Sequence, residues 1–457
     1  APIVFTTMVQ FLEALFGSGT RGVRRMHHLA QSVIIFDEIQ ALPIRMTHLF
    51  NNTINYLVDI CNSSAVLCTA TQPCLHRVEP SKGAMNLHHP PHVSEIIQDV
   101  SKLFRDLRRT SVKDIRKVGG WTSKAVAELI NNELAISGSV LVVVNTKKSA
   151  HSLFQICKEF KPAEVVHLST DMCPAHRREV LKTIKECTNP KHTKQIICIS
   201  TQLIEAGIDV DFGSVIRYLA GFDSIGQAAG RCNRNGRKET GRVVIVNPAH
   251  ENLGTLEDIK IGQKIAKTVL DNFKDNKEMF ENDLLHPNLM SEFFEYYFFA
   301  RKDEMEYPTP KGMFQQSETL LNLLSTNQKA LQNFSQAQGS PKRPEYPLVQ
   351  SFKSAAKAFK VIDTKTQGII VPYEDAGKEI IASLCASENL YKEVMLLKKA
   401  QNYSVNCFEN KITILEKKGA LHNIQESGIY CLKPEYYHKH YGVCEEPDFS
   451  LMELLNA

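Results

Sequence analysis

The sequence predicts an α/β protein with two successive parallel sheets and a smaller α+β domain at its end. First, short apolar runs without alternation recur over roughly the first 250 residues, as in strands covered on both faces. Second, amphipathic helical stretches separate these runs, which is typical of βαβ units. Third, aromatic and then proline-rich polar segments replace the strands after that point.

Composition indicates an ordinary globular chain of 457 residues, long enough for about three domains. The formal net charge of +4 is small for this length and does not by itself indicate a nucleic-acid-binding protein. The twelve cysteines form no Cys-x-x-Cys pair, which favours a reducing compartment over disulfides or a zinc site. No apolar run approaches membrane-spanning length. We therefore expect a cytoplasmic protein.

The first residues point to a continuation upstream. Residues 3–5 are apolar and are predicted to form a strand, and the chain begins with Ala1 instead of Met, so we expect further sequence before it. Thr7 opens a Thr-x-x-Gln capping box before an apolar helix at residues 11–16. The glycine-rich stretch at residues 17–22 has the outer spacing of a phosphate loop but lacks its Lys-Ser/Thr. We expect a surface loop there, and no complete phosphate loop occurs in the sequence.

Two adjacent carboxylates, Asp37 and Glu38, follow directly after the apolar run 33–36. Open α/β sheets bind ligands at the carboxyl ends of their strands. An Asp at such a position can hold Mg²⁺ beside a nucleotide phosphate, and the next Glu can orient or deprotonate the attacking water. The alternative is a pair of solvated acids in a loop. A second buried strand is expected at residues 65–68 and ends in Thr69-Ala70-Thr71.

A second βαβ unit follows, and two of its strands also end in polar residues. Asn145 and Thr146 come after the run 140–144, and a polar stretch from Ser200 to Asp209 comes after the run 196–199. Further strands are expected at 165–168, 215–219 and 243–246, with helices at 148–160 and 175–187. Right-handed crossovers then determine most of the topology.

An arginine pair is the most specific pattern of this unit. Arg231 and Arg234 are three residues apart, so on a helix they would share one face, and Gly230 would allow close approach to a backbone or a phosphate. Two guanidinium groups suit the stabilisation of charge on a transferring phosphoryl group. The alternative is a solvated basic helix that continues into Arg237 and Lys238.

The remainder reads as helices, a linker and a small domain. An amphipathic helix is expected at 256–273, and the aromatic residues within 288–300 are better explained by core packing than by base stacking. A polar linker at 302–347 surrounds one helix near 318–334. The clearest strands of the final α+β domain are predicted at 368–372 and 411–415.

Four segments carry a family resemblance. Asp-Glu-x-x, Thr-Ala-Thr, Ser-Thr-Gln with Glu-Ala-Gly-Ile-Asp, and Gln-x-x-Gly-Arg-x-x-Arg occur in this order and resemble motifs II, III, V and VI of superfamily 2 helicases. The local sequences at 34–42, 201–212 and 229–236 are similar to those of the CRISPR-associated helicase–nuclease of type I interference systems. The motif-bearing part runs from Ile3 to about Pro248, and the tail resembles the family's accessory domain more weakly.

The resemblance implies tandem RecA-like sheets, the first of them incomplete. Residues 1–100 would be the remainder of the first RecA-like domain and 101–250 the second. Residues 251–349 would form a helical segment and linker, and 350–457 the accessory C-terminal domain.

The resemblance also implies ATP and Mg²⁺ as cofactors. Asp37 would hold the metal and Glu38 would activate water. The residues expected to face the nucleotide from the second domain are Gly207, Asp209, Gln227, Arg231 and Arg234. Thr69 and Thr71 would couple hydrolysis to strand movement, with a strand cap as their alternative role.

Hydroxyl and amide side chains would line the path of single-stranded DNA and grip its phosphates without reading sequence. These residues are Thr7, Asn145, Thr146, Thr201 and Gln202. For Thr7 the capping box is an equally good explanation.

The implied function is an ATP-dependent 3′–5′ translocase or helicase that loads on the displaced DNA strand after recruitment to an RNA-guided surveillance complex. The missing phosphate loop, and the absence of the adjacent His-Asp pair of the family's nuclease domain, imply that an upstream part of the same protein or a separate chain supplies both. Alone, this polypeptide is expected neither to bind ATP well nor to cut DNA. Two alternatives are a superfamily 2 RNA helicase and a catalytically silent, truncated DNA-binding subunit.

Overall fold

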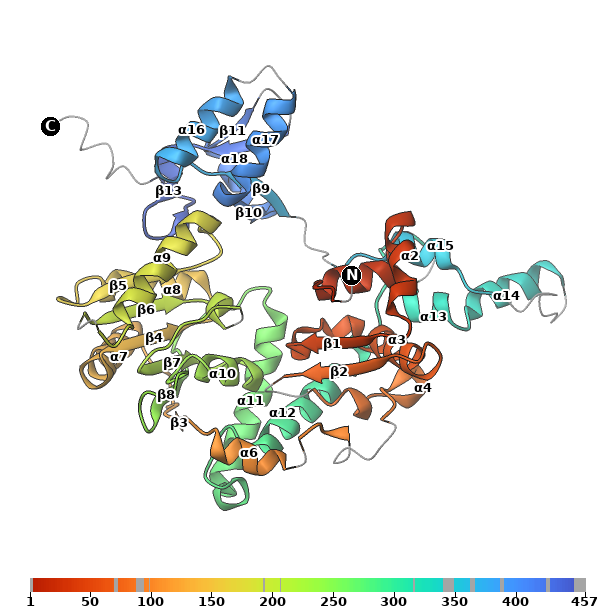
Figure 1. Ribbon diagram of the computed structural model, residues 1–457, viewed down its shortest axis with the longest axis horizontal. Helices are drawn as coiled ribbons and strands as arrows, with labels where there is room; N and C mark the ends of the chain where they lie inside the picture. The colour runs from red at the N-terminus through yellow and green to blue at the C-terminus, as the bar shows by residue number, and fades with distance from the viewer. Residues whose placement is uncertain are drawn as a thin grey trace. The chain divides into compact units, whose positions relative to one another are not determined.

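The computed structural model describes residues 3–69, 73–87, 94–97, 99–191, 194–205, 207–314, 317–339, 349–361, 366–386, 390–424 and 428–447. It divides into two compact units, drawn in Figure 1. Unit 1 comprises Ala1–Asp106 with His286–Asp363, and unit 2 comprises Leu107–Leu285 with Thr364–Ala457. The predicted α/β class is confirmed, whereas the four predicted domain boundaries stay a prediction.

Unit 1 contains a pair of parallel strands, β1 (Val33–Asp37) and β2 (Ser64–Cys68), with Ile35 opposite Val66. Three aromatic rings form the centre of its core: Phe36 contacts Phe11 and Phe50 edge-on, each with ring centroids 5.1 Å apart. The helices of this unit are α1 (Met8–Phe16), α2 (Thr20–Met26), α3 (Thr47–Asp59), α4 (Pro80–Gly83), α6 (Val100–Asp106), α12 (Pro287–Ala300), α13 (Leu320–Leu324), α14 (Gln328–Ala337) and α15 (Phe352–Ala358).

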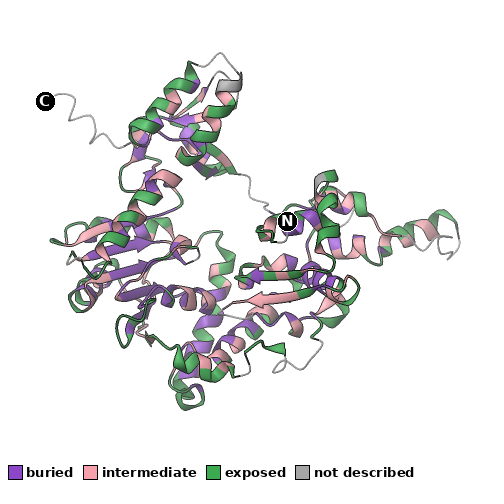
Figure 2. Cartoon of the chain, viewed as in Figure 1, coloured by how far each residue is buried: buried purple, intermediate pink, exposed green. Residues whose placement is uncertain are grey.

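One face of the β1–β2 pair is open. Val33 and Ile35 are 69% and 65% exposed, whereas Phe36, on the opposite face, is buried (Figure 2). The prediction of a strand covered on both faces is therefore wrong for β1, because helices of the described chain cover only one side of it. The expected strand at residues 3–5 is also wrong: these side chains are exposed and their backbone is irregular.

Later in unit 1, two predictions agree with the structure only in part. The helix expected near residues 318–334 is divided into α13 and α14, which Asn327 separates in a left-handed conformation. In α12, Phe293 and Phe294 are buried in the core, as expected for packing, whereas Phe299 is exposed.

Unit 2 contains a six-stranded, wholly parallel sheet in the order β3-β8-β7-β4-β6-β5. Helices α7 and α8 pack on one face and α9 and α10 on the other, so both faces are covered. The elements are β3 (Thr110–Asp114), α7 (Ser123–Ser137), β4 (Ser139–Val143), α8 (Lys147–Cys157), β5 (Glu164–Leu168), α9 (Pro174–Cys187), β6 (Ile196–Ser200), β7 (Ser214–Tyr218), α10 (Phe222–Ala229), β8 (Gly241–Val246) and α11 (Glu257–Asp275).

The strand order creates a topological switch point between β4 and β7. The chain leaves β4 through α8 toward β5 on one side, and it leaves β7 through α10 toward β8 on the other. Val143 lies opposite both Ser200 of β6 and Arg217 of β7, so the carboxyl ends of the three strands are level. In open α/β sheets this edge is where ligands bind.

The last part of unit 2 is a small α+β domain with a four-stranded sheet in the order β10-β9-β12-β11. The strand predicted at 368–372 is observed as β9, two residues earlier. The strand predicted at 411–415 is wrong: these residues lie in α18, where Ile412 and Leu415, three positions apart, face the core. The elements are β9 (Thr366–Ile370), α16 (Glu374–Cys385), α17 (Leu390–Ala400), β10 (Ser404–Phe408), α18 (Glu409–Lys417), β11 (Leu421–Ile424), β12 (Ile429–Leu432), β13 (Tyr437–His438) and β14 (Gly442–Val443).

This small domain is bonded to the six-stranded sheet through Asp171. The Asp171 carboxylate accepts from Lys147 at 2.9 Å and from Lys411 of α18 at 2.7 Å, and its carbonyl accepts from the Val443 backbone. Gly442 has a φ of +80°, and a Cβ there would lie 2.0 Å from the Asp171 carbonyl oxygen. Only glycine fits this approach.

Histidines and aromatic rings fill the rest of the contact. Tyr441 packs edge-on against Phe154 and His167, and Tyr373 stacks on His176. His167 of β5 is buried, and its Nδ1 has no hydrogen-bond partner. Burial lowers the pKa of His167 to about 4, with further lowering by His151, His176 and His440 and a small opposing effect of Asp171.

No helix in the part of the chain that the structure describes combines the length and the apolar character needed to cross a membrane.

The His167 burial predicts acid sensitivity of unit 2. In the unfolded chain His167 takes up a proton as the pH falls through about 6.5, whereas in the folded chain it stays neutral until about 4. His167 should therefore lower the free energy of unfolding by about 2 kcal/mol from about pH 7.5 to about pH 5. His176, whose pKa burial likewise lowers to about 4, should add a similar loss. Urea unfolding followed by fluorescence of Trp121, the single tryptophan, measures it.

His167→Phe should remove about half of that pH dependence, because it keeps a ring against Phe154 and Tyr441 without a titratable group, while His176 still titrates. His422→Phe, at an exposed position of β11, is the matched control and should leave it unchanged. An unaltered pH slope in His167→Phe would contradict the assignment.

Candidate nucleotide and nucleic-acid site

The Asp37-Glu38 pair lies at the carboxyl end of β1, as expected. Glu38 adopts a left-handed conformation with φ of +55°, which is uncommon for a residue with a side chain. Its backbone N–H donates to the Asp37 carboxylate at 3.1 Å. Both carboxylates are exposed. An observed strained residue at a strand end is a reason to suspect function.

Gln40 connects this pair to the next strand, and the sequence analysis missed it. Its amide nitrogen donates to the Glu38 carboxylate, and its amide oxygen accepts from the Thr69 hydroxyl. The amide thus joins the end of β1 to the end of β2. Its position two residues after Glu38 was the available signal. Thr71 lies outside the described residues.

Thr7 caps helix α1. Its hydroxyl accepts from the backbone N–H of Gln10 at 3.2 Å, so the capping alternative for this residue is observed. A role in gripping DNA stays a prediction.

In unit 2 the polar residues after β4 and β6 lie at the same edge of the sheet. Thr146 caps α8 through the Ser149 backbone N–H. Thr201 precedes the short helix that begins at Gln202, and both Thr201 and Gln202 are partly exposed. Asn145 differs, because it is buried and its amide donates to the Leu219 carbonyl and to Glu251. In this structure Asn145 supports the loop instead of facing solvent.

The two arginines occupy different environments, which corrects the expectation of a shared helical face. Helix α10 ends at Ala229, before both of them. Arg231 is buried, and it donates to the carbonyls of Ile204 and Glu205 at 3.0 and 2.5 Å. Arg234 is partly exposed and forms a 3.0 Å ion pair with Asp209.

The structure therefore brings the 201–209 and 231–234 segments together, as the helicase-like interpretation requires. Gly207, with a φ of +70°, lies within the first of these segments and is exposed. Gln227 lies on α10 and is partly exposed. The roles of these residues toward a nucleotide stay predictions.

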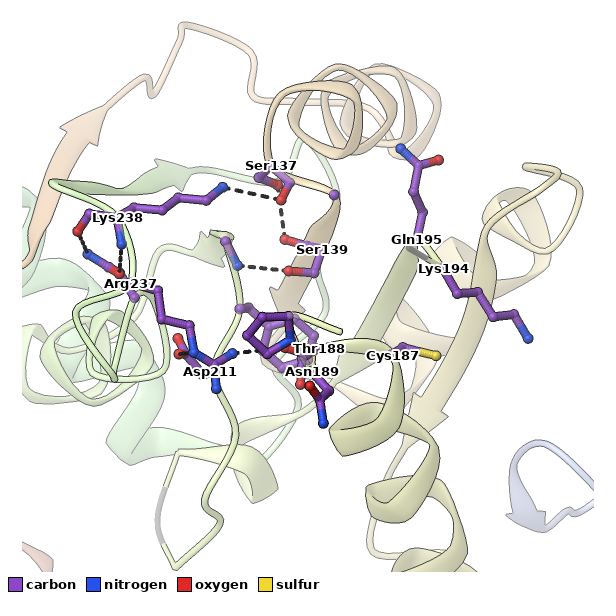
Figure 3. Close-up of a pocket in the computed structure, with 15 residues that line it drawn as sticks. Ser137, Ser139, Cys187, Thr188, Asn189, Lys194, Gln195, Asp211, Arg237 and Lys238 are labelled. Carbon is purple, nitrogen blue, oxygen red and sulfur yellow. Dashed lines mark hydrogen bonds and ion pairs between the residues drawn. The ribbon is translucent and has the colours of Figure 1, made fainter. Parts of the chain in front are cut away.

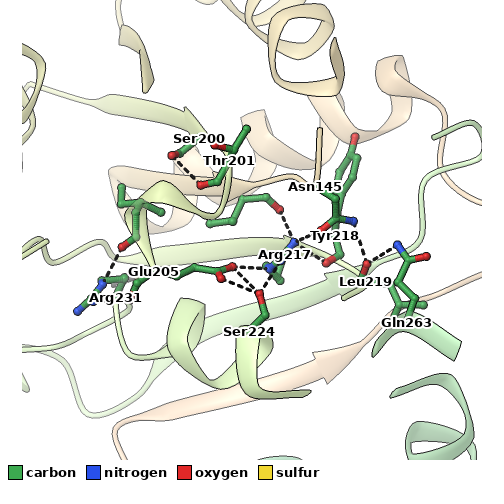
Figure 4. Close-up of polar contacts among 12 residues, drawn as sticks. Asn145, Ser200, Thr201, Glu205, Arg217, Tyr218, Leu219, Ser224, Arg231 and Gln263 are labelled. Carbon is green, nitrogen blue, oxygen red and sulfur yellow. Dashed lines mark hydrogen bonds and ion pairs between the residues drawn. The ribbon is translucent and has the colours of Figure 1, made fainter. Parts of the chain in front are cut away.

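A buried ion pair that the sequence analysis missed lies beneath this edge (Figure 4). Arg217 of β7 has no exposed surface, and its Nε lies 3.0 Å from the Glu205 carboxylate. Ser224 donates to the same carboxylate at 2.7 Å. Burial raises the pKa of the Glu205 carboxyl, and the adjacent Arg217 charge opposes that shift. A charged residue within an otherwise apolar strand was the available signal.

A cavity of about 530 Å³ lies at the opposite end of this sheet (Figure 3). Ser139, Gln195 and Gly213, which line it, are located at the amino ends of β4, β6 and β7. Its basic side chains are bonded to protein groups: Arg237 donates to the Thr188 carbonyl, and Lys238 to that of Ser137. The cavity is thus separate from the predicted site residues.

Asp37 and Glu38 offer the hard oxygen ligands that Mg²⁺ prefers. Among the described residues no group of three or more His, Cys, Asp or Glu side chains could hold a metal ion. Magnesium sites commonly use one or two carboxylates and complete their shell with water and substrate phosphates. The residues present therefore fit a metal that arrives with a nucleotide.

The different burial of the two arginines predicts different effects on stability. Arg231→Ala leaves two buried carbonyls unpaired and should lower the free energy of unfolding of unit 2 by about 3 kcal/mol. Arg234→Ala removes a solvent-screened pair and should change it by less than about 1 kcal/mol. Urea unfolding monitored through Trp121 measures both. Equal losses in the two variants would mean that the burial difference is wrong.

Comparisons with known proteins agree on one family. A family model described as the C-terminal part of the CRISPR-associated nuclease/helicase Cas3 matches residues 137–237. A Haloferax volcanii protein named CRISPR-associated nuclease/helicase Cas3 is 25% identical over 335 residues, which cover 55% of this chain and 35% of that protein.

Solved structures agree in fold. The crystal structure named T. fusca Cas3-ATP has a TM-score of 0.59 at 14% identity and covers 97% of this chain and 55% of its own. That of T. fusca Cas3 has a TM-score of 0.53 at 15% identity and covers 80% and 45%. The chain thus spans about a third of the Haloferax protein and about half of the T. fusca protein. The predicted resemblance is confirmed: this chain is similar to the C-terminal part of the CRISPR-associated nuclease/helicase Cas3.

Proposed function

We propose that this chain is part of an ATP-dependent, single-stranded DNA translocase or helicase that moves 3′ to 5′ in a type I CRISPR effector. The observation that carries the proposal is the bonding of the 204–209 segment to the 231–234 segment through Arg231 and Arg234. The resemblance to superfamily 2 helicases implies that these two motifs act on the same nucleotide. The sequence similarity to Cas3 supports the choice of DNA and of CRISPR interference.

The proposed roles follow from the chemistry of each group. Asp37 would hold Mg²⁺ and Glu38 would orient water, with Gln40 keeping the Glu38 side chain near Thr69. Arg234 would leave Asp209 to meet phosphate charge, because an exposed ion pair contributes little and exchanges readily. Bound Mg²⁺–ATP would supply the scissile phosphoanhydride bond. Gly207 and Gln227 would face the nucleotide as well.

Thr7, Thr146, Thr201 and Gln202 would contact the DNA backbone, and Asn145 would hold the loop that carries Thr146. Hydroxyl and amide groups bind phosphates without reading bases, as a translocating enzyme needs. Thr69 and Thr71 would couple hydrolysis to movement of the strand. Recruitment to an RNA-guided surveillance complex, after which the enzyme unwinds and helps degrade target DNA, completes the proposal.

The open face of β1 and β2 supports a further partner, namely the polypeptide that carries the phosphate loop. Parallel strands are normally covered on both faces, whereas Val33 and Ile35 are exposed here. An α/β segment that packs on this face would bury them and would place its phosphate loop near Asp37. It belongs to the same natural protein or to a separate chain.

ATPase assays on the natural protein that contains this chain test the enzymatic proposal. Asp37→Ala and Arg234→Ala should each lower kcat at least ~100-fold, because each removes charge stabilisation at the transferring phosphoryl group. Arg237→Ala is the neighbouring control, since Arg237 donates to the Thr188 carbonyl and lies 3.8 Å from Asp211 with no proposed part in the site, and it should stay within about threefold. Activity that survives both substitutions would exclude the proposed roles.

The same assay separates the alternatives. Stimulation of hydrolysis by single-stranded RNA but not by DNA would identify an RNA helicase. DNA binding without any hydrolysis would identify a silent DNA-binding subunit.

Co-purification tests the open face. Ile35→Asp should abolish association with a separately expressed upstream segment that carries the phosphate loop, because a buried, unpaired carboxylate is costly. Ile60→Asp, at an exposed position at the end of α3, should leave association intact. Equal binding by both variants would show that the partner uses another surface.

A further inference from the structure

Arg217 is the largest fully buried side chain in the described part of the chain. It projects from the carboxyl end of β7, beside the switch point with β4. A buried guanidinium group is tolerated only where charge and hydrogen bonds compensate it. The hydrogen-bond and ion-pair partners of Arg217 therefore show which segments of the chain it holds together.

Those partners come from separate segments of unit 2. One terminal nitrogen donates to the Asn145 side chain and to the Tyr218 carbonyl, each at 2.8 Å. The other donates to the Ser224 hydroxyl at 2.7 Å, and Nε pairs with Glu205 at 3.0 Å. The loop after β4, the segment after β6 and helix α10 thus meet on one side chain (Figure 4).

Glu205 bonds to one arginine through its side chain and to another through its backbone. Its side chain pairs with Arg217, while its backbone carbonyl accepts from Arg231 at 2.5 Å. A shift of Arg231 therefore displaces the backbone of Glu205 and, with it, the carboxylate that holds Arg217.

Asn145 links Arg217 to the residues that are proposed to contact DNA. Its oxygen accepts from Arg217, and its nitrogen donates to the Leu219 carbonyl and to Glu251. Glu251 also accepts from Ser149 in the first turn of α8, the helix that Thr146 caps. Arg231 is thereby connected to Thr146 through a continuous series of contacts, which are buried as far as Asn145 and partly buried beyond it.

We propose that Arg217 and Glu205 are positioning residues that couple the 231–234 segment, whose exposed Arg234 would meet the nucleotide, to the DNA-facing loop of the second sheet. The inference rests on the proposed function. In a buried, low-dielectric site such a network keeps its bonds by moving as a unit, since each broken bond leaves a polar group unpaired. Neither residue touches substrate in this scheme.

The competing explanation is that the ion pair only maintains the fold. Loss of fold support would weaken DNA binding equally with and without nucleotide. Loss of coupling would instead change the ratio of the two affinities, because coupling between sites is defined by that ratio. The ratio therefore distinguishes a positioning role from a structural one.

The experiment measures the affinity of the natural protein for a fluorescent single-stranded DNA, with and without Mg²⁺ and a non-hydrolysable ATP analogue. We expect the parent protein to show a change of at least about fivefold between the two conditions. The double variant Glu205→Gln/Arg217→Met removes both charges together, which buried pairs often tolerate. Its ratio should fall below about twofold.

A second buried ion pair provides the matched control. Asp114 and Arg116, 2.8 Å apart and with side chains 7% and 8% exposed, lie at the end of the edge strand β3. Asp114→Asn/Arg116→Met should keep the parental ratio. If the Glu205/Arg217 variant does not fold, Ser224→Ala removes only the bridging hydroxyl and should reduce the ratio at least by half.

The outcomes are separable. A parent protein whose DNA affinity does not respond to the nucleotide would overturn the proposed function and the inference with it. A responsive parent, with an unchanged ratio in both network variants, would overturn the inference alone. A collapsed ratio in the network variants, together with a preserved ratio in the control, supports it.

Discussion

The parallel order of β7, β4 and β6 constrains the rest of the second unit. Because the three strands run the same way and are level at Val143, Ser200 and Arg217, their following loops must lie at one edge. The chain also turns in opposite directions after β4 and β7, which separates their loops. Arg217 lies between these loops. Because its charge is buried, the neighbouring segments must supply hydrogen-bond and ion-pair partners.

Burial divides the candidate site residues into those that hold the site and those that can meet a ligand. Asn145, Glu205, Arg217 and Arg231 are buried and bond to one another or to backbone carbonyls. Asp209 and Arg234 remain accessible, joined by an exposed ion pair that is easily exchanged. The same division recurs in unit 1, where exposed carboxylates at the end of β1 are joined to β2 through Gln40. A supported rim of accessible polar groups suits a ligand that is bound and released repeatedly.

The sequence predicted several elements for physical reasons that hold in the structure. Unbroken apolar runs such as residues 140–144 became buried central strands, because a parallel sheet covered by helices has no solvent-facing side. The same reasoning was wrong for Val33 and Ile35. Apolar side chains show that a strand can be covered on both faces, but the described chain covers only one face of β1. At residues 411–415, the consecutive β-branched residues 412–414 are typical of a strand, but these residues lie in a helix, where Ile412 and Leu415 face the core at a spacing of three.

Local sequence thus determined the α/β class, the positions of β4, β5, β6, β7 and β8, and the polar residues that follow β1, β4 and β6, because periodicity and strand-end chemistry are properties of short segments. The tertiary structure decided which of those polar residues are buried and which are accessible. It ended α10 before Arg231, separated the environments of the two arginines, and joined Arg217 to Glu205 and Asn145. Such contacts join segments that are distant in the chain, and burial depends on how whole layers pack, so no single segment encodes them.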